Sequence, residues 1–331
     1  MNFSVIRRII GLAVIGGFLL ILPSHILRAM TVSPVRLELA GNPGEEVSGY
    51  FKVINEETEP KTLYTTFENF EAMGETGSPQ FLPGQTGLAS WINAPREIVV
   101  GPGETKSIDF LINIPAGTEP GGHFAAIFLG TTPPSADSNE LAIGARIGTL
   151  VLLRVNGDIK EGAALLEFNT AEQKKWHTYL PINLYYRFQN TGNDRIMPRG
   201  DLTITNTIGR TTKVMNANSV QGNILPRSIR RFELWWQKND TQEKVKLPPQ
   251  DMGFWETAKY QWHNFAFGYY KATVNVSYGS QNEKASAQTS LFVVPWQLLL
   301  LELLVLAVIA FILFLIIKRY NTFIIKRARR S

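Results

Sequence analysis

VRLELAGNPGEEVSGYFKVI, residues 35–54, contains two runs in which apolar and polar side chains alternate. The runs cover residues 35–39 and 47–54, and the turn residues Asn42-Pro43-Gly44-Glu45 separate them. Alternation with a period of two is typical of β-strands, because successive side chains point to opposite faces, and a Pro-Gly pair is typical of a turn. The stretch therefore predicts two strands joined like a hairpin.

Further short strands follow through the first half of the chain. Turn segments separate them, such as Gly74-Glu75-Thr76-Gly77 and Pro102-Gly103. The predicted strands are residues 63–70, 97–100, 107–114, 125–129 and 147–155. Since no segment of comparable length has a helical period, this half is expected to form an antiparallel sandwich.

The second half of the chain has the same pattern. Its predicted strands are residues 180–188, 200–206, 210–214, 230–236, 268–278 and 285–294. Turn residues Asn156-Gly157-Asp158 mark the boundary between the halves. We therefore predict an all-β fold class with two tandem immunoglobulin-like β-sandwich domains, residues 30–157 and 158–294, and expect residues 250–265 to form a loop or a short helix.

A membrane-spanning helix is predicted at the C-terminal end, over residues 295–317. The residues from 296 to 317 are almost all Leu, Ile, Val, Phe and Ala, and as a helix they span about 33 Å, which exceeds a bilayer core of about 30 Å. Glu302 lies near the start of this run, where a carboxylate can reach the interface. Residues 318–331 contain six Lys and Arg side chains and no acid, so the positive-inside rule predicts a cytoplasmic tail.

The N-terminal end agrees with this topology. Arg7 and Arg8 precede an apolar run over residues 9–22, followed by Pro23 and Ser24, which is typical of a secretory signal. Residues 1–29 are therefore predicted to be a signal peptide, either cleaved after Ala29 or retained as a signal anchor. In both cases the two sandwiches are expected outside the cytoplasm, in a single-pass protein of the cell membrane.

Composition excludes several classes of function. The formal net charge is +5, but the basic residues at the two chain ends account for more than this excess, so the middle of the chain is near neutral and nucleic-acid binding is not expected. The chain has no Cys, so neither a disulfide nor a lipoprotein anchor is expected.

Motifs of catalysis are missing from the sequence. There is no Gly-x-Ser-x-Gly, no His-Glu-x-x-His and no phosphate-binding Gly-rich loop. His123 is far in sequence from His177 and His263, so a metal site is not expected and a packed or surface histidine is favoured. We predict a protein that is not an enzyme and has no cofactor.

Several segments resemble the WxL-interacting cell-surface proteins of Gram-positive bacteria. In the first half these are Asn42-Pro43-Gly44-Glu45, Val53-Ile54-Asn55, Trp91-Ile92, Pro102-Gly103-Glu104-Thr105, Ile114-Pro115 and Gly121-Gly122-His123-Phe124-Ala125-Ala126. In the second half they are Phe188-Gln189-Asn190-Thr191-Gly192-Asn193, Pro198-Arg199-Gly200, Ile224-Leu225-Pro226 and Gly268-Tyr269-Tyr270-Lys271-Ala272. The resemblance implies peptidoglycan binding by the first domain and a protein partner for the second.

Aromatic residues supply the candidate contacts to a partner. Trp255, Tyr260 and Trp262 lie in the segment without alternation, and Trp91 is the candidate in the first domain. Two interpretations stay open for the segment: its rings bind a sugar or protein, or they form a small core, with Trp262, Phe265 and Tyr269 on one face of a short helix.

The resulting hypothesis is a non-enzymatic, membrane-anchored adhesion or scaffold protein that binds a cell-wall polymer such as peptidoglycan, or a cell-surface protein. One alternative is a membrane-tethered chaperone of pilus type, which requires Arg36 to bind a carboxylate beside a second cation and requires an exposed sheet edge. A carbohydrate-active enzyme is the third alternative and requires an exposed pair of carboxylates.

Overall fold

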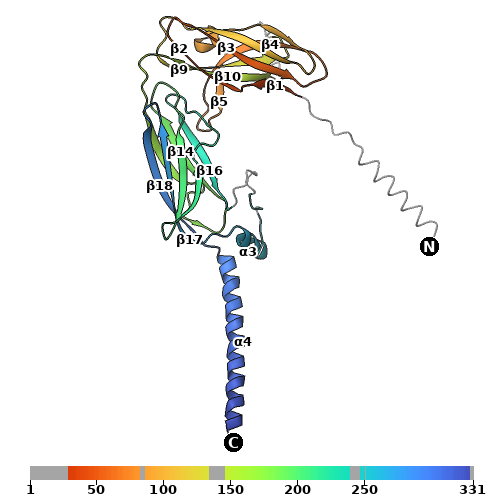
Figure 1. Ribbon diagram of the computed structural model, residues 1–331, viewed down its shortest axis with the longest axis vertical. Coiled ribbons are helices and arrows are strands. Elements are labelled where there is room, and N and C mark those ends of the chain that lie inside the picture. The colour runs from red at the N-terminus through yellow and green to blue at the C-terminus, as the bar shows by residue number, and fades with distance from the viewer. Residues whose placement is uncertain (1–28, 83–85, 134–145, 239–246, 250, 329–331) are drawn as a thin grey trace, which may run out of the picture.

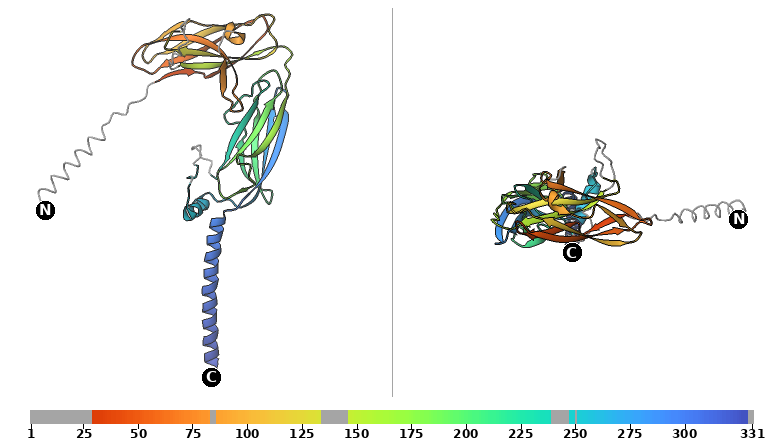
Figure 2. Two further views of the ribbon diagram at one scale, coloured as in Figure 1. Left: turned by 180° about the vertical axis from the view of Figure 1, so that it is seen from behind. Right: turned by 90° about the horizontal axis from the view of Figure 1, so that it is seen from above.

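The computed structural model describes residues 29–82, 86–133, 146–238, 247–249 and 251–328. Two β-sandwich domains follow one another along the chain, and the first lies across the end of the second, so that together they form an L (Figure 1). A long helix leaves the other end of the second domain (Figure 2). The predicted fold class is confirmed, whereas residues 1–28 of the predicted signal segment lie outside the described residues.

The first domain packs two sheets against each other. One has the strand order β1-β3-β8-β6, and the other has the order β2-β10-β9-β4-β5, with β7 also paired to β4. The bounds are β1 Met30–Ser33, β2 Arg36–Gly41, β3 Glu46–Asn55, β4 Lys61–Ala72, β5 Pro79–Leu82, α2 Gly87–Trp91, β6 Ile92–Asn93, β7 Glu97–Val100, β8 Thr105–Asn113, β9 Gly121–Gly130 and β10 Arg146–Val155.

The pairing predicted for residues 35–54 is wrong. Both strands form, but β2 runs parallel to β10 in one sheet, while β3 pairs with β1 and β8 in the other. The turn at Gly44, with φ of +82°, therefore crosses from sheet to sheet. Alternation determines which face of a strand is apolar but does not select its neighbour, so consecutive strands can face each other across a core.

The second domain is also a two-sheet sandwich. Its strand orders are β11-β13-β16 and β12-β18-β17-β14-β15. The bounds are β11 Ala163–Thr170, β12 Trp176–His177, β13 Ile182–Asn190, β14 Arg199–Asn206, β15 Thr211–Asn216, β16 Ile229–Trp236, α3 Phe254–His263, β17 Gly268–Tyr278 and β18 Glu283–Val293. Strand β11 was not predicted, because a bulge between Leu165 and Glu167 interrupts its alternation.

Each domain has its own core of buried apolar side chains. Phe51, Phe110 and Ile112 belong to the core of the first domain, and Leu184 and Tyr186 to that of the second. The hydroxyl of Tyr186 donates a hydrogen bond of 3.0 Å to a backbone oxygen, so its burial leaves no unpaired polar atom. Since neither core contains residues of the other domain, the hydrophobic effect stabilises each sandwich separately.

Helix α4, Trp296–Ala328, continues past the predicted end of the apolar segment. Residues 296–323 are long and apolar enough to cross a membrane, and the most apolar part of this helix is not buried against the rest of the protein. A core helix of a soluble protein would be covered by other elements. The exposed apolar surface of α4 is typical of a helix that contacts lipid.

Neighbouring residues on β3 allow a matched test of the first core. Phe51 is fully buried, with its ring centroid 6.2 Å from that of Phe110, whereas Tyr50 is 56% exposed. Phe51→Ala should lower the free energy of unfolding by about 3–5 kcal/mol, because it leaves a cavity, and Tyr50→Ala by about 0.5 kcal/mol or less. Urea unfolding in detergent, followed by circular dichroism, measures both, and equal losses would contradict this assignment of faces.

Candidate functional site: the cleft between the two domains

The loop between β13 and β14 holds the two sandwiches together. The backbone N–H of Gly122 donates to the backbone oxygen of Asn193 at 2.9 Å, and the side-chain amide of Asn193 donates to the backbone oxygens of Pro120 at 3.1 Å and Asp158 at 3.0 Å. Its Oδ1 accepts a hydrogen bond from the N–H of Lys160 at 2.8 Å. Asn193 therefore connects the first domain, the linker and the second domain.

The β4–β5 hairpin of the first domain reaches the second domain at a separate point. The carboxylate of Glu75 accepts hydrogen bonds from Arg187, one of them from Nε at 2.7 Å, and the N–H of Arg231 donates to the backbone oxygen of Glu75 at 2.9 Å. The hydrogen bond from Arg187 lowers the pKa of Glu75, although burial acts in the opposite direction. The hairpin thus bridges the two sandwiches.

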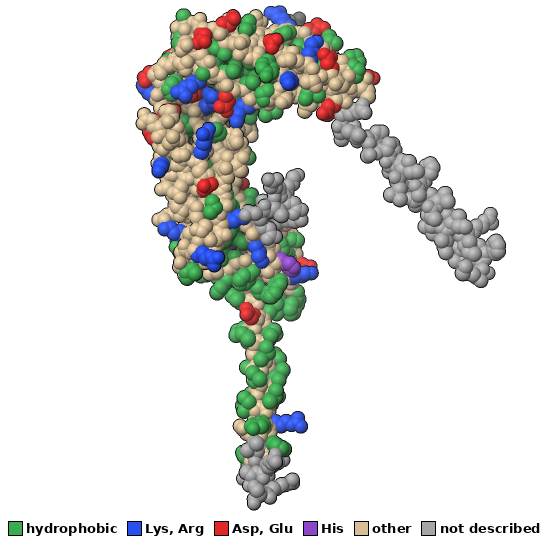
Figure 3. Space-filling view, in the orientation of Figure 1, with side chains coloured by type: hydrophobic (Ala, Val, Ile, Leu, Met, Phe, Trp, Pro, Cys, Tyr) green, Lys and Arg blue, Asp and Glu red, His purple; other side chains and the backbone are tan. Residues whose placement is uncertain are grey.

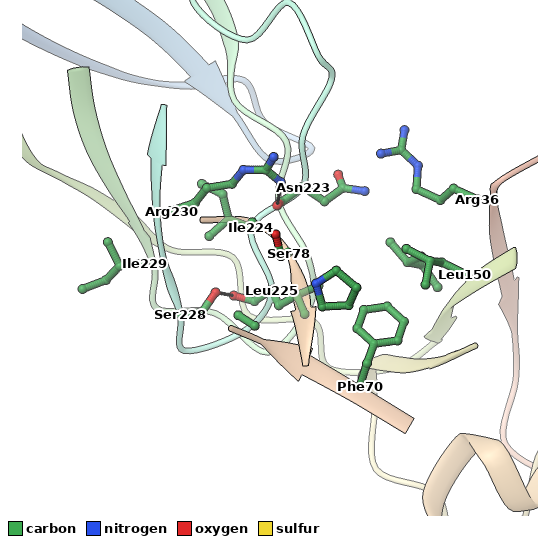
Figure 4. Close-up of a pocket in the computed structure, with 14 residues that line it drawn as sticks. Arg36, Phe70, Ser78, Leu150, Asn223, Ile224, Leu225, Ser228, Ile229 and Arg230 are labelled. Carbon is green, nitrogen blue, oxygen red and sulfur yellow. Dashed lines mark hydrogen bonds between the residues drawn. The ribbon is translucent and has the colours of Figure 1, made fainter. Parts of the chain in front are cut away.

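A small cleft lies between the two domains beside this hairpin, with walls from both (Figure 4). Its volume is about 90 Å³, which is far below the roughly 300–1,000 Å³ of pockets that enclose a drug-sized ligand. The lining residues are Arg36, Phe70, Ala72, Gly77, Ser78, Pro79, Leu150, Leu152, Asn223, Ile224, Leu225, Ser228, Ile229 and Arg230. The cleft fits one side chain or one terminal group.

Arg36 enters the cleft from the first domain. Its Nε lies 3.2 Å from Glu38 Oε1, and its Nη1 donates to the backbone oxygen of Gln221 at 3.0 Å. Glu38 also lies 3.3 Å from Arg195 and accepts a hydrogen bond of 3.0 Å from Asn223. Burial raises the pKa of Glu38, but the hydrogen bond from Asn223 and the charges of Arg195 and Arg36 outweigh it and lower the pKa. One carboxylate thus partly neutralises two arginines.

Arg230 enters from the second domain, on the opposite wall (Figure 4). Its guanidinium lies between Gly77 and Gly222, and a Cβ at either glycine would collide with it. Its Nη1 donates to the backbone oxygen of Asn223 at 2.8 Å. Burial lowers the pKa of Arg230, and the charge of Arg36 acts in the same direction. Among the described residues no carboxylate forms an ion pair with this partly desolvated cation.

This arrangement is suited to bind a small anion. A guanidinium presents N–H donors in a planar fork that matches a carboxylate or a phosphate. Asp, Glu and His are missing from the lining residues, so the cleft supplies no pair of groups for acid–base catalysis. Within the described part of the chain, no cluster of three or more His, Asp or Glu residues could hold a metal ion.

Trp91 lies outside this cleft. It ends α2 and packs partly against the core of the first domain, with its ring centroid 4.9 Å from that of His123. The Nε2 of His123 lies 3.1 Å from the backbone oxygen of Glu119. Trp91 is thus half-buried in a ring contact, and its role in binding a partner stays a prediction.

The other three aromatic candidates lie on α3, also away from the cleft. Trp255 and Trp262 are 72% and 69% exposed. Tyr260 is half-buried, with its ring centroid 5.2 Å from that of Tyr179. The short helix expected within residues 250–265 is therefore present, and two of its predicted contact residues are free to meet a partner or a surface.

The helical face predicted for Trp262, Phe265 and Tyr269 is wrong. Helix α3 ends at His263, and Tyr269 lies on β17. The buried residues of α3 are instead Thr257, Ala258 and Gln261. The aromatic spacing was misleading because it continues past the end of the helix.

Sequence reasoning identified Arg36 but missed Arg230. Consecutive arginines on a strand point to opposite faces, and Arg231 does lie over the ring of Tyr185, 3.8 Å from its centroid. The sequence therefore offered one sign of the site: in the predicted strand over residues 230–236, Arg230 points to the face opposite to that of Arg231. Its position against Gly77 depends on how the domains dock, which no local pattern describes.

Comparison with known proteins yields similar folds only. No protein-family model and no curated protein matches the sequence, so the resemblance to WxL-interacting proteins stays a prediction. Similar solved structures include the class 5 fimbriae chaperone CfaA, with 13% identity over 80% of this chain and 99% of that chain at a TM-score of 0.37. The CupB2 chaperone of Pseudomonas aeruginosa has 9% identity, covering 79% of this chain and 100% of that chain, at a TM-score of 0.34. The E. coli chaperone DraB has 11% identity, covering 79% of this chain and 98% of that chain, at a TM-score of 0.34. These similarities concern the sandwich fold alone.

Glu75 makes the hairpin contact dependent on pH. Because its pKa is lowered in the folded chain, its stabilising contribution is present above the pKa of the unfolded chain and is lost as the pH falls through the lowered value. Glu75→Gln should therefore lower the melting temperature at pH 7, and the difference from wild type should shrink towards pH 3. Glu71→Gln, at an exposed position on the same hairpin, is the control and should have little effect at either pH. A difference that grows on acidification would contradict the role of the carboxylate.

Proposed function

We propose that this chain is a membrane-anchored, non-enzymatic binding protein of the cell envelope, and that the cleft between its domains receives an anionic group of an extended partner polypeptide. The observation behind this proposal is the pair of Arg36 and Arg230, which enter one cleft from different domains. Arg230 is partly buried and, among the described residues, forms no ion pair with a carboxylate, so an incoming carboxylate would gain charge-assisted hydrogen bonds there.

The size and lining of the cleft favour a chain end or a single acidic side chain. A volume of about 90 Å³ admits a carboxylate with few further atoms, so most of the partner would lie on the surface outside. Phe70 and Leu150 line the cleft beside the arginines and offer an apolar contact to the partner's adjacent side chain.

A sheet edge beside the cleft offers a place for the rest of an extended partner. Strand β10 pairs with β9 along its whole length, but its pairing with β2 begins only at Leu150, opposite Arg36. Among the described strands none pairs with the other edge of residues 146–148. Backbone N–H and C=O groups at such an edge bind an extended peptide by strand addition.

This proposal refines the sequence hypotheses. The pilus-type chaperone alternative required a second cation near Arg36 and an exposed sheet edge, and Arg230 and residues 146–148 supply candidates for both. Adhesion or scaffolding through a surface protein remains compatible with the same cleft. Peptidoglycan binding rests on the family resemblance and stays a prediction, and the carboxylate pair that a carbohydrate-active enzyme needs is not among the lining residues.

The proposed location follows from α4 and the basic residues after it. If α4 spans the membrane with its C-terminal end in the cytoplasm, a tag before Pro295 should be digested by protease added to intact cells, and a tag after Ser331 should be protected. Protease digestion followed by immunoblotting measures both. Digestion of the C-terminal tag in sealed cells would overturn the proposed orientation.

Binding at the cleft predicts a preference for free carboxylates. The full chain in lipid nanodiscs should bind members of an array of synthetic peptides as free acids more tightly than as C-terminal amides. Arg36→Ala should weaken that binding by about tenfold or more, since a hydrogen bond to a charged group contributes about 1.5–3 kcal/mol.

Two further variants test whether the loss of binding is specific to Arg36 or follows from removing any positive charge. Lys52→Ala removes an exposed cation from β3, which lies in the other sheet, and should leave peptide binding unchanged. Arg36→Lys retains the charge but loses the fork, and should bind with intermediate strength. Equal losses for Arg36→Ala and Lys52→Ala would reject the proposed site. Equal affinity for acids and amides would show that the group bound there is not the C-terminal carboxylate.

A further inference from the structure

Exposed aromatic side chains gather at the end of the second domain from which α4 leaves. Apart from α4 itself, the exposed large aromatic side chains of the described chain are Tyr50, Trp176, Phe254, Trp255, Trp262, Phe265 and Phe267. Only Tyr50 belongs to the first domain. Trp176 stacks on Phe292, four positions before the start of α4, and the others lie on α3 or directly after it. Figure 3 shows the hydrophobic surface of this end continuing into that of α4.

Helix α3 is held firmly against the first turn of α4. The side-chain oxygen of Gln261 accepts a hydrogen bond of 3.0 Å from the N–H of Leu298, and its amide donates to Gln297 at 2.6 Å. The ring of Phe254 lies edge-on to that of Trp296, with centroids 6.0 Å apart. Since Gln261 is fully buried, these contacts fix the position of α3 beside the start of the apolar helix.

The side of α3 that faces away from the domain is apolar with a basic residue between its rings. Thr257, Ala258 and Gln261 are buried, whereas Trp255, Lys259 and Trp262 are exposed, as are the flanking Phe254, Glu256 and His263. Their spacing of four and three residues places these three side chains on one face of the helix. A large exposed apolar face is unfavourable in water, so this face is expected to be covered.

The exposed rings of α3 and of the residues after it continue into the apolar surface of α4. Trp262 and Phe265 line one hollow together with Leu298, Leu301, Glu302, Val305 and Leu306 of α4, so these two rings and the start of the apolar helix form a single surface. Lys238 lines the same hollow, and its Nζ donates to the backbone oxygen of His263 at 3.1 Å. Tryptophan rings prefer the boundary between lipid tails and headgroups, and lysines there can reach the phosphates.

We infer that α3 and residues 264–267 form a foot that lies in the headgroup layer of the bilayer crossed by α4, with Trp255, Trp262 and Phe265 inserted among the lipids. This inference rests on the proposed membrane anchoring by α4. The foot gives the second domain a contact with the membrane in addition to α4 and restricts the tilt of the domain. It also assigns Trp255 and Trp262 to lipid rather than to the polypeptide that binds at the cleft.

The test uses the absence of Cys from the chain. Single substitutions Trp262→Cys, Phe265→Cys, Val308→Cys and Tyr50→Cys each create one site for a nitroxide label in the full chain, reconstituted in nanodiscs of phosphatidylcholine and phosphatidylglycerol. Electron paramagnetic resonance then measures collisions with oxygen, which concentrates in lipid, and with a water-soluble nickel chelate. Val308 lies on α4 and reports the anchor, whereas Tyr50 reports the aqueous domain.

The expected result is a gradient of depth. Labels at 262 and 265 should have a ratio of oxygen to nickel collisions several-fold above that at 50 and below that at 308. If the collision ratios of the labels at 262 and 265 equal that at 50 while the ratio at 308 indicates lipid, the proposed foot is overturned and the membrane anchor stands. If 308 also matches 50, the proposed anchoring fails as well. Labels at 262 and 265 that are shielded from both reagents would indicate a protein partner on this face and would also overturn the inference.

Discussion

The hydrogen bonds of Asn193 join the two sandwiches and the linker at one point, and the proposed binding cleft lies between the domains that they hold together. This side chain satisfies backbone groups of the first domain and of the linker, while its own backbone oxygen accepts from Gly122. The contact is close enough that Gly121, with φ of +135°, cannot carry a side chain: a Cβ there would collide with the backbone oxygen of Asn193. A polar contact thus joins two domains that have separate cores.

The chemistry of the junction differs from that of the domain interiors. The two cores are apolar and separate, so they contribute stability to each sandwich without favouring a particular docking of the two. Polar contacts join the domains in two separate groups, in which Glu75 pairs with Arg187 and Glu38 pairs with Arg195 and Arg36. Partly exposed ion pairs of this kind contribute little free energy each. Neither group supplies a carboxylate to Arg230, as far as the described residues extend.

Helix α4, helix α3 and the cleft form a series along the molecule (Figure 1). Helix α4 continues from β18, α3 packs on the first turn of α4, and the cleft lies at the opposite end of the second domain, where the first domain crosses it (Figure 1). In the proposed orientation the second domain acts as a spacer between the membrane and the cleft. A partner polypeptide would then meet the cleft at a distance from the lipid surface.

The sequence by itself determined much, but not all, of the local structure of this protein. Alternation of apolar and polar residues predicted β17 and β7 at their observed bounds. This pattern is local, because it arises wherever one face of a strand packs in a core and the other faces solvent. The apolar run at the C-terminal end predicted α4 for an equally local reason, since helix length and side-chain type alone decide whether a segment can cross a bilayer. Arg36 could be proposed as a binding residue, but without its second cation.

Only the tertiary structure decided which elements meet. Strand β2 pairs with β10, more than 100 residues away, and not with the adjacent β3, because face polarity does not specify a neighbour. Arg230 reaches the cleft only because Gly77 and Gly222 leave room for its guanidinium, and these residues come from different domains. The rings of α3 were visible in the sequence, but the burial of Gln261 against α4 decides that they face outward beside the apolar helix. Such contacts bring together residues that are far apart in the sequence. They depend on how the whole chain folds, and a local sequence pattern carries no information about that.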